Sequence, residues 1–314
     1  MPYKVLIPID ISAGGKEYLI RKGYEITIGT QDEIDLNIAG DYEAILLRTS
    51  QVNEAVLCAA KKLKVIGRYG VGLDNIDLEG CKKRGIRVTS APVANIVSVA
   101  EYTLLMILQC AKNTYEVERL WRSAQNDFNS RNTHCGIELD GRSLGLVGGG
   151  RIGSLVAKRA QAFGMKILAY DPYLPLEKQI PDVIYFKSLD EMLADADFVS
   201  LHVPLTKETC HLMGAEQFSR MKKTAYLINA SRGPVVDEPA LIEALKKGQL
   251  AGAGIDVFEN EPKVWPNPLF EMKNVVVSPH IAGMTIESSD RVGIHAAMGI
   301  DDVLSGREPQ WPVI

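Results

Sequence analysis

Short apolar runs of strand length alternate with stretches in which apolar residues recur at helical spacing, along the whole 314-residue chain. This alternation is typical of α/β domains built on parallel sheets. A first group of predicted strands covers residues 4–8, 25–28, 44–47, 64–66 and 87–88. A second group covers residues 143–147, 166–170, 198–202, 225–228, 254–258 and 275–277. The pattern therefore predicts two doubly wound parallel sheets.

Helical patterns separate and follow these two groups. Ser98 and Glu101 have the spacing of a capping box, which predicts a helix that begins at Ser98. Residues 285–304 carry apolar side chains on one side, and Gly306 ends the pattern. A helix after the last strand can return to the first domain. We therefore expect a discontinuous first domain (1–100 and 285–314), a second domain inserted into it (101–284), and a cleft between them.

Charge and cysteine usage narrow the class of protein. The formal net charge is −4 without a basic run, so nucleic acid is not an expected partner. The longest apolar runs fall short of the roughly 18 residues needed to span a membrane, and the N-terminus lacks a signal-peptide layout. The five cysteines are scattered and contain no CxxC pair, which favours free thiols. We expect a cytoplasmic protein.

A glycine-rich loop stands between a predicted strand and a predicted helix. Gly148 permits the turn, Gly150 lets a pyrophosphate approach the backbone, and Gly153 lets the helix pack on the strand. Arg151 and Ile152 then open the helix, where free N–H groups face the phosphates. A lone glycine pattern is weak, but this strand–loop–helix context predicts a dinucleotide site.

Asp171 ends the next predicted strand, where an acidic side chain accepts hydrogen bonds from the adenosine ribose. Pro172 and Tyr173 follow it, so the loop offers no arginine for a 2′-phosphate. The sequence therefore predicts NAD as the cofactor in preference to NADP.

Three later strand ends each place one ionisable side chain: Arg232, Glu261 and His280. A guanidinium stabilises the oxyanion that develops when a 2-keto acid is reduced, and histidine titrates in the range a general acid needs. A carboxylate beside the histidine favours its charged form. Glu259, two residues before Glu261, could be mistaken for that carboxylate. This set lacks metal-ligand spacing, so we expect no metal.

On these motifs the chain resembles the D-isomer-specific 2-hydroxyacid dehydrogenase family, most of all its phosphoglycerate dehydrogenases. The resemblance implies that Arg232 binds the substrate carboxylate and carbonyl, and that Glu261 pairs with the acid/base His280. It also implies that Asp256 accepts from the nicotinamide carboxamide. Residues at neighbouring strand ends are expected to line the cofactor: His202, Val203, Pro204, Ala230, Ser231 and Gly283.

The first domain supplies the expected substrate contacts. After the predicted strand at 64–66, the amides of Val71 and Gly72 can form an anion-binding nest. Arg48 resembles a substrate-anion contact. Arg131 lies where relatives carry an arginine on a dimer arm, but Asn129 replaces the usual tryptophan, which leaves its role open.

The resemblance implies an NAD-dependent dehydrogenase of a small 2-hydroxy acid, with 3-phosphoglycerate as the first substrate to test. Two alternatives remain: a hydroxypyruvate or glyoxylate reductase, and a non-catalytic dinucleotide-sensing corepressor, against which the three reactive side chains argue. Formate dehydrogenase activity is disfavoured by Glu261. Residues 115–131 would otherwise be an exposed, partly apolar arm, so we expect a homodimer.

Overall fold

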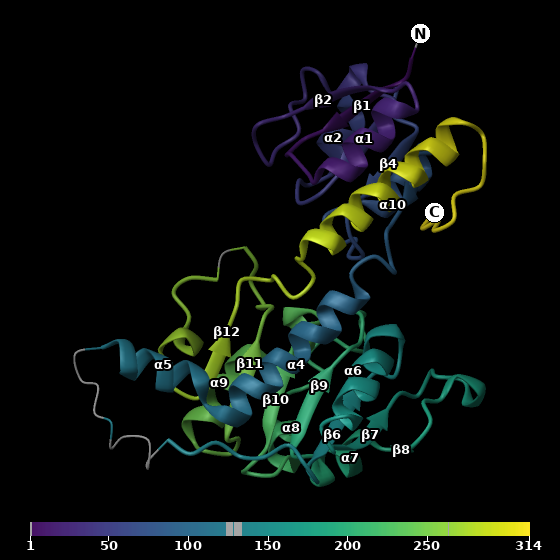
Figure 1. Cartoon of the computed structure of the whole chain (residues 1–314). Helices are drawn as coiled ribbons and strands as arrows, with labels where there is room; N and C mark the ends of the chain where they lie inside the picture. Colours follow the sequence, from purple (N-terminus) through teal and green to yellow (C-terminus); the bar gives the residue numbers. More distant parts are fainter. Residues whose placement is uncertain (1, 124–127, 129–133, 263) are drawn as a thin grey trace. The chain divides into compact units, whose positions relative to one another are not determined.

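The computed structural model describes residues 2–123, 128, 134–262 and 264–314 (Figure 1). The chain forms two compact units: unit 1 contains Met1–Ile96 and Met284–Ile314, and unit 2 contains Val97–Gly283. Each unit holds one parallel sheet with helices on both faces. The expected α/β architecture, with one domain inserted into a discontinuous other, is confirmed.

Unit 1 has a five-stranded sheet with the order β2-β1-β3-β4-β5. Its strands are β1 (Lys4–Ile7), β2 (Glu25–Ile28), β3 (Ala44–Leu47), β4 (Val65–Arg68) and β5 (Arg87–Thr89). Its helices are α1 (Ala13–Arg21), α2 (Glu54–Ala59), α3 (Leu78–Lys83) and α10 (Ile286–Leu304). Strand side chains alternate between two cores, one under α2 and α3 and the other under α1 and α10.

Unit 2 has a seven-stranded sheet with the order β12-β11-β10-β9-β6-β7-β8. Its strands are β6 (Ser143–Val147), β7 (Lys166–Tyr170), β8 (Val183–Tyr185), β9 (Phe198–Leu201), β10 (Tyr226–Asn229), β11 (Gly252–Ile255) and β12 (Val275–Val277). Its helices are α4 (Ile96–Lys112), α5 (Thr114–Arg122), α6 (Arg151–Gln161), α7 (Leu189–Asp195), α8 (Ala215–Arg220) and α9 (Glu238–Lys246).

Side-chain alternation gives the sheet of unit 2 two buried faces. Phe198 and Ile228 point into a core with α4 and α6. Their neighbours Val199 and Leu227 point into the opposite core with α7, α8 and α9. Because both faces of these strands are covered, most of their positions are apolar, which explains the nearly continuous apolar runs in the sequence.

The strand order of unit 2 reverses between β6 and β9. The chain builds outward from β6 through β7 and β8, then returns to place β9 on the other side of β6. At such a reversal the loops of a doubly wound sheet leave in opposite directions, and ligands bind outside the carboxyl ends of the strands there. The predicted cofactor and catalytic residues all follow carboxyl ends of this one sheet.

Some predicted boundaries are wrong. Helix α4 begins at Ile96, so Ser98 is a buried interior residue and no N-cap. Strand β11 covers Gly252–Ile255, and the prediction of 254–258 runs too far because Val257 and Phe258 are also apolar and buried, although they lie in the loop after the strand. The short edge strand β8 was not predicted from its sequence. The C-terminal helix is confirmed, and Thr285 caps it by accepting from the Ser288 amide.

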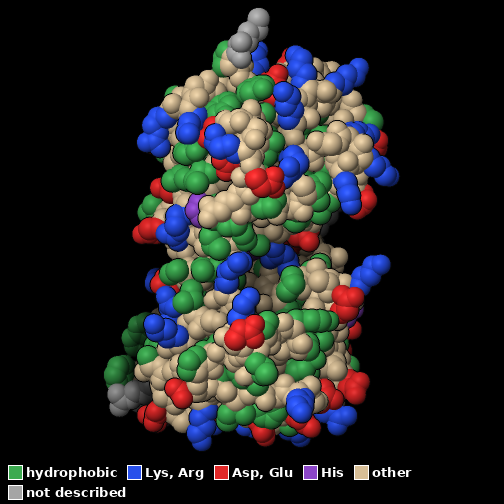
Figure 2. All heavy atoms as spheres, turned by 90° about the vertical axis from the view of Figure 1, so that its right-hand side faces the viewer, with side chains coloured by type: hydrophobic (Ala, Val, Ile, Leu, Met, Phe, Trp, Pro, Cys, Tyr) green, Lys and Arg blue, Asp and Glu red, His purple; other side chains and the backbone are tan. Residues whose placement is uncertain are grey.

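Acidic and basic side chains are interspersed over the face of the molecule drawn in Figure 2. Within the described ranges, none of the helices combines the length and the apolar character that a membrane crossing requires.

Candidate active site

The glycine loop joins β6 to α6 at the point where the strand order reverses. Gly148 has a positive φ of 100°, and a side chain there would meet the carbonyl oxygen of His202 at 2.8 Å. A Cβ on Gly153 would lie 2.3 Å from the Gly148 carbonyl oxygen, so the first turn of α6 packs directly on the loop. Both glycines are therefore required by the backbone geometry.

The same loop leaves room for a ligand. A Cβ at Gly150 would meet no described atom within 4 Å, in contrast to Gly148 and Gly153. Gly150 is the N-cap of α6 and provides no side-chain cap, and the amides of Arg151 and Ile152 have no partner within the helix. Open space beside unpaired helix amides fits a phosphate group.

Asp171 follows β7 and bends toward the glycine loop. Its carboxylate accepts from the Gly149 amide at 2.9 Å and from the Tyr173 amide at 3.0 Å. These bonds fix the carboxylate beside the loop and leave it partly exposed. The arrangement is compatible with the predicted ribose contact.

His202 follows β9 and lies beneath the glycine loop. Its Nε2 is 2.9 Å from the Ser200 hydroxyl, and its amide donates to the Val147 carbonyl. Burial lowers the pKa of His202 to about 4, so the ring is neutral at physiological pH. A neutral ring suits the sequence-based expectation of a cofactor-lining residue without acid/base chemistry.

The loop after β10 presents Arg232. Buried Asn229 accepts from the Ser231 amide and hydroxyl, and its Nδ2 donates to the Arg232 carbonyl at 3.0 Å. The Arg232 guanidinium donates to the Ser231 carbonyl at 2.7 Å. Asn229 was not predicted as a functional residue, although asparagine commonly bonds backbone groups two residues ahead.

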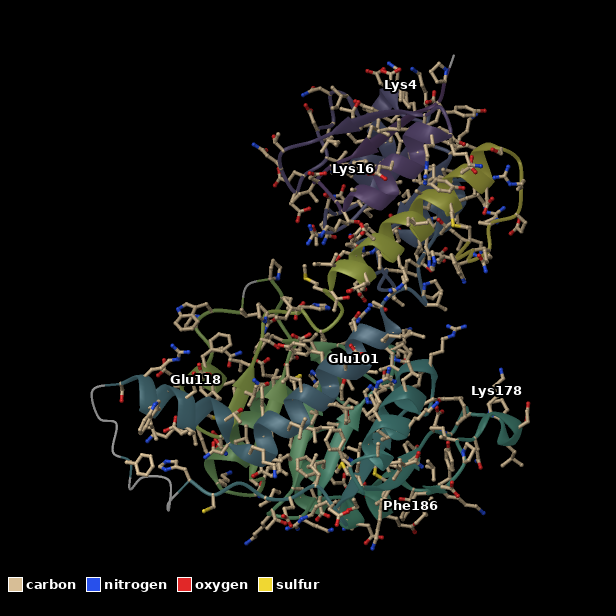
Figure 3. All side chains as sticks on the ribbon, viewed as in Figure 1. Lys4, Lys16, Glu101, Glu118, Lys178 and Phe186 are labelled. Carbon is tan, nitrogen blue, oxygen red and sulfur yellow. The ribbon has the colours of Figure 1, made fainter. Side chains whose placement is uncertain are left out.

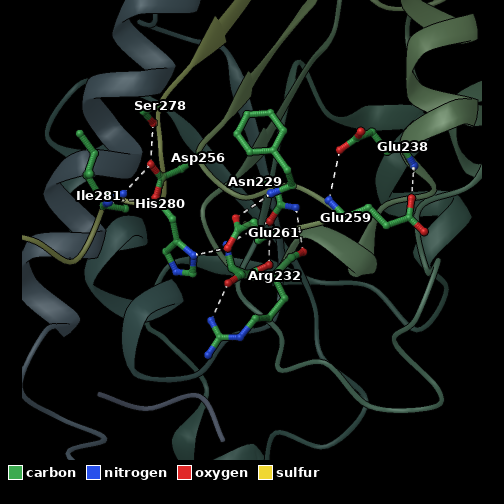
Figure 4. A network of polar contacts seen from close by, with 12 residues as sticks. Asn229, Arg232, Glu238, Asp256, Glu259, Glu261, Ser278, His280 and Ile281 are labelled. Atoms are coloured by element: carbon green, nitrogen blue, oxygen red, sulfur yellow. Dashed lines mark hydrogen bonds and ion pairs between the residues drawn. The ribbon is translucent and has the colours of Figure 1, made fainter. Parts of the chain in front are cut away.

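Asp256 anchors the loop that follows β12. Its side chain has no exposed surface, and its carboxylate accepts from the Ser278 hydroxyl and from the amides of Ile281 and Ala282. Its backbone carbonyl accepts from the His280 amide at 2.7 Å. This set of contacts holds His280 at a left-handed φ of 54° (Figure 4). The contact of Asp256 with a nicotinamide carboxamide stays a prediction.

His280 and Glu261 form a hydrogen-bonded pair. Their Nδ1 and Oε2 atoms are 2.7 Å apart, and the other carboxylate oxygen accepts from the Phe258 amide at 2.9 Å. Burial alone raises the pKa of Glu261, but the bonds from His280 and Phe258 and the charges of His280 and Arg232 hold that pKa below its ordinary value. Glu261 is thus ionised, and the His280 side chain is half exposed.

The ambiguity between the two glutamates is resolved by their partners. Glu259 lies 2.7 Å from the Nε2 of His211, and its second oxygen accepts from the amide of Glu238. In the described part of the chain, the carboxylate bonded to His280 is that of Glu261, and the oxygens of Glu259 are taken up by His211 and Glu238. The sequence-based choice of Glu261 as the partner of His280 agrees with this geometry.

The expected substrate residues lie in unit 1. Arg48 follows β3, and its guanidinium reaches the Asp10 carbonyl at 3.5 Å. Arg68 donates to the carbonyls of Tyr69 and Gly72 at 2.5 and 2.6 Å and so holds the loop that contains Val71. The amides of Val71 and Gly72 have no backbone partner in the described part of the chain. Arg131 and Asn129 lie outside the described residues.

The fold and the site geometry of unit 2 are those of a dinucleotide-binding α/β protein that also carries an arginine and a histidine–glutamate pair. Residues 104–282 match the family described as D-isomer specific 2-hydroxyacid dehydrogenase, NAD binding domain. The chain is 40% identical over 306 residues to a D-3-phosphoglycerate dehydrogenase of Archaeoglobus fulgidus, which covers 96% of this chain. It is 45% identical over 284 residues to a glyoxylate reductase of Thermofilum pendens, which covers 89% of it. The chain belongs to the D-isomer-specific 2-hydroxyacid dehydrogenases.

A solved structure of a similar protein contains the cofactor NAD. The D-lactate dehydrogenase of Aquifex aeolicus, complexed with NAD and lactic acid, has a TM-score of 0.84 and 34% identity over 96% of both chains. NAD binding by this family is thereby confirmed. The present chain spans 58% of the length of the Archaeoglobus relative and 83% of the Thermofilum relative.

Proposed function

We propose that this chain is an NAD-dependent dehydrogenase that interconverts a small D-2-hydroxy acid and its 2-keto acid. The observation that carries the proposal is the hydrogen-bonded pair of His280 and Glu261, whose Nδ1 and Oε2 atoms are 2.7 Å apart. This pair and Arg232 all follow carboxyl ends of strands in the same sheet. NAD as its partner is supported by the first amides of α6, which lack an intrahelical partner, and by the open space beside them at Gly150.

The side chains have distinct roles in this proposal. Arg232 binds the substrate carboxylate and stabilises the negative charge that develops on the carbonyl oxygen. His280 donates the proton that this oxygen needs, from the ring nitrogen that faces away from Glu261. Glu261 fixes the orientation of the ring through its bond to Nδ1. NADH, when bound, supplies the hydride that the carbonyl carbon accepts. In the oxidative direction a neutral His280 removes the hydroxyl proton.

The proposed cofactor contacts follow the carboxyl ends of the strands in unit 2. The phosphates are held by the loop from Gly148 to Gly153, and the adenosine ribose by Asp171. The nicotinamide half is lined by His202, Val203, Pro204, Ala230, Ser231, Asp256 and Gly283. Unit 2 is accordingly the NAD-binding domain and unit 1 the substrate-binding domain.

The substrate class rests on the anion-binding groups of unit 1. Arg48 and the amides of Val71 and Gly72 suit an acid with a second anionic group, and 3-phosphoglycerate is the first to test. The Thermofilum relative supports a second candidate, because the chain covers 83% of that glyoxylate reductase. A non-catalytic NAD sensor would not need the His280–Glu261 pair.

A homodimer is proposed through α5. This helix exposes Tyr115, Val117 and Trp121, and Trp121 packs edge-on against the exposed Phe128 at 6.2 Å. Glu118, labelled in Figure 3, pairs with Arg122 on the same helix. An amphipathic helix with exposed aromatic side chains is a typical contact surface.

The test is a panel of 2-keto acids with NADH or NADPH. Phosphohydroxypyruvate, hydroxypyruvate and glyoxylate should be reduced with different kcat/KM values, followed by loss of NADH absorbance. A preference for phosphohydroxypyruvate supports the phosphoglycerate assignment, and a preference for glyoxylate supports the reductase. NADH binding without turnover of any keto acid would instead favour a dinucleotide sensor.

A further inference from the structure

Two loops of unit 2 that carry reactive groups touch at Gly233. This residue follows Arg232, and a Cβ there would lie 1.9 Å from the Phe258 carbonyl oxygen. Phe258 in turn donates its amide to Glu261. The Arg232 loop and the Glu261 loop therefore meet backbone to backbone, with no side chain between them.

A second connection lies beside this contact. Glu238, in the segment that follows the Arg232 loop, and Glu259, in the Glu261 loop, are joined by a reciprocal pair of hydrogen bonds (Figure 4). The Glu259 amide donates to the Glu238 carboxylate at 3.2 Å, and the Glu238 amide donates to the Glu259 carboxylate at 3.3 Å. Glu238 is the first residue of α9, so the Glu259 carboxylate also satisfies an unpaired amide at a helix N-terminus.

Two further side chains complete this cluster, which we call the Glu238–Glu259 clamp. Asn267 donates to the free oxygen of Glu238 at 2.7 Å, and the Nε2 of His211 lies 2.7 Å from the free oxygen of Glu259. All four carboxylate oxygens then have partners. A saturated polar network of this kind fixes geometry, because each lost bond leaves another polar group unsatisfied.

We propose that Glu238 is a positioning residue of the reaction, which holds the Glu261 loop against the Arg232 loop. The inference rests on the proposed function. Glu238 lies outside the reacting groups, and it acts on them through Glu259, two residues from Glu261, and through the segment that follows Arg232. A small shift of Glu259 moves the Glu261 carboxylate, and with it the His280 ring, relative to the Arg232 guanidinium. Displacements of this kind strongly reduce turnover.

The experiment compares Glu238→Ala and Glu238→Gln with the matched control Glu243→Ala, an exposed position on the same helix. Glu238→Ala should lower kcat by about 10-fold or more with NADH affinity nearly unchanged, and should increase the primary isotope effect with deuterated NADH. Glu238→Gln keeps one acceptor oxygen but turns its NH₂ group toward the other donor, either the Glu259 amide or Asn267, so it should restore kcat only in part. Wild-type kcat and isotope effect in folded Glu238→Ala would overturn the proposal.

A second readout does not require turnover. In histidine-labelled protein, the nitrogen signals of His280 report its bond to Glu261, and they are assigned by their loss in His280→Ala. These signals should change in Glu238→Ala and stay unchanged in Glu243→Ala. If the wild type reduces no keto acid, the proposed function fails. The His280 signals still show in that case whether Glu238 positions the His280–Glu261 pair. If Glu238→Ala does not fold, Asn267→Asp is tested in its place, because this substitution keeps the side-chain shape and places a carboxylate against that of Glu238. Unchanged His280 signals in Asn267→Asp would also overturn the proposed role of Glu238.

Discussion

The substitution Asp256→Asn tests whether a buried carboxylate holds His280 in place. The wild-type carboxylate accepts three hydrogen bonds with no exposed surface. Asparagine keeps one oxygen, which can serve Ser278 and Ile281, but turns its NH₂ group toward the Ala282 amide. One bond to a charged acceptor is lost and a buried donor is left unsatisfied, at a cost of about 2–3 kcal/mol.

That cost falls on a loop already held in an unfavourable conformation. His280 has a φ of 54°, which a non-glycine residue adopts at a penalty of about 1 kcal/mol. Losing 2–3 kcal/mol lets the loop relax, and the fraction of protein with a correctly placed imidazole then decreases. Because about 1.4 kcal/mol corresponds to tenfold, kcat should decrease by about 30- to 100-fold.

The assay measures kcat, KM, NADH affinity and melting temperature for Asp256→Asn beside a matched control. Asp197→Asn breaks a comparable anchor at the amino end of the same sheet, where Asp197 accepts from Ser143 and Lys222. The control should lower the melting temperature and leave kcat unchanged. Wild-type kcat in folded Asp256→Asn would refute the reasoning. A weaker NADH affinity with unchanged kcat would point instead to the carboxamide contact.

Four further changes have defined outcomes. His280→Ala should lower kcat by about 100-fold or more with NADH affinity retained, and unchanged kcat would reject its acid/base role. Asp171→Ala should weaken NADH binding and reduce discrimination against NADPH, measured by fluorescence titration with both cofactors; an unchanged preference would reject the ribose contact. Gly153→Ala places a Cβ 2.3 Å from the Gly148 carbonyl and should abolish NADH binding or destabilise unit 2 in calorimetry, so normal affinity and stability would contradict the close approach. Asp301→Asn should destabilise unit 1 by about 2 kcal/mol at neutral pH. Burial raises the pKa of Asp301, but bonds from Tyr24, Lys22, Tyr18 and Arg307 hold it below its ordinary value, so this stabilisation is present above pH 4 and is lost as the pH falls through the lowered pKa. A difference in melting temperature that persists at lower pH would argue against this charge.

Periodicity and motifs predicted most of the fold because each depends on neighbouring residues. Strands β2, β3, β6, β7 and β12 have the predicted bounds. For β3 and β6 the reason is that a parallel strand buried at every position is a continuous apolar run. β8 was missed because it is a three-residue edge strand whose Ile184 is exposed. The capping box at Ser98 is wrong because α4 starts earlier and buries that serine.

The supporting contacts of the site depend on residues far apart in the chain, and this is why the sequence did not predict them. Asp256 and Ala282 are separated by 26 positions, and Glu238 and Asn267 by 29. A motif identifies the side chain that does the chemistry, because that chemistry restricts the residue type. The anchor of the loop can be any donor or acceptor that the fold places there.

Two histidine–glutamate pairs in unit 2 have similar local geometry, and their surroundings separate them. His280 and His211 both have positive φ, and both lie 2.7 Å from a glutamate oxygen. Backbone strain and a short bond therefore do not identify the reactive pair. The partner of His211, Glu259, is bound to the amide of a helix N-terminus and to a network of its own. The partner of His280, Glu261, feels the charge of Arg232, and that guanidinium is the group able to hold a carboxylate substrate beside the ring. Substitution of His211 should consequently alter turnover only through the clamp, and far less than substitution of His280.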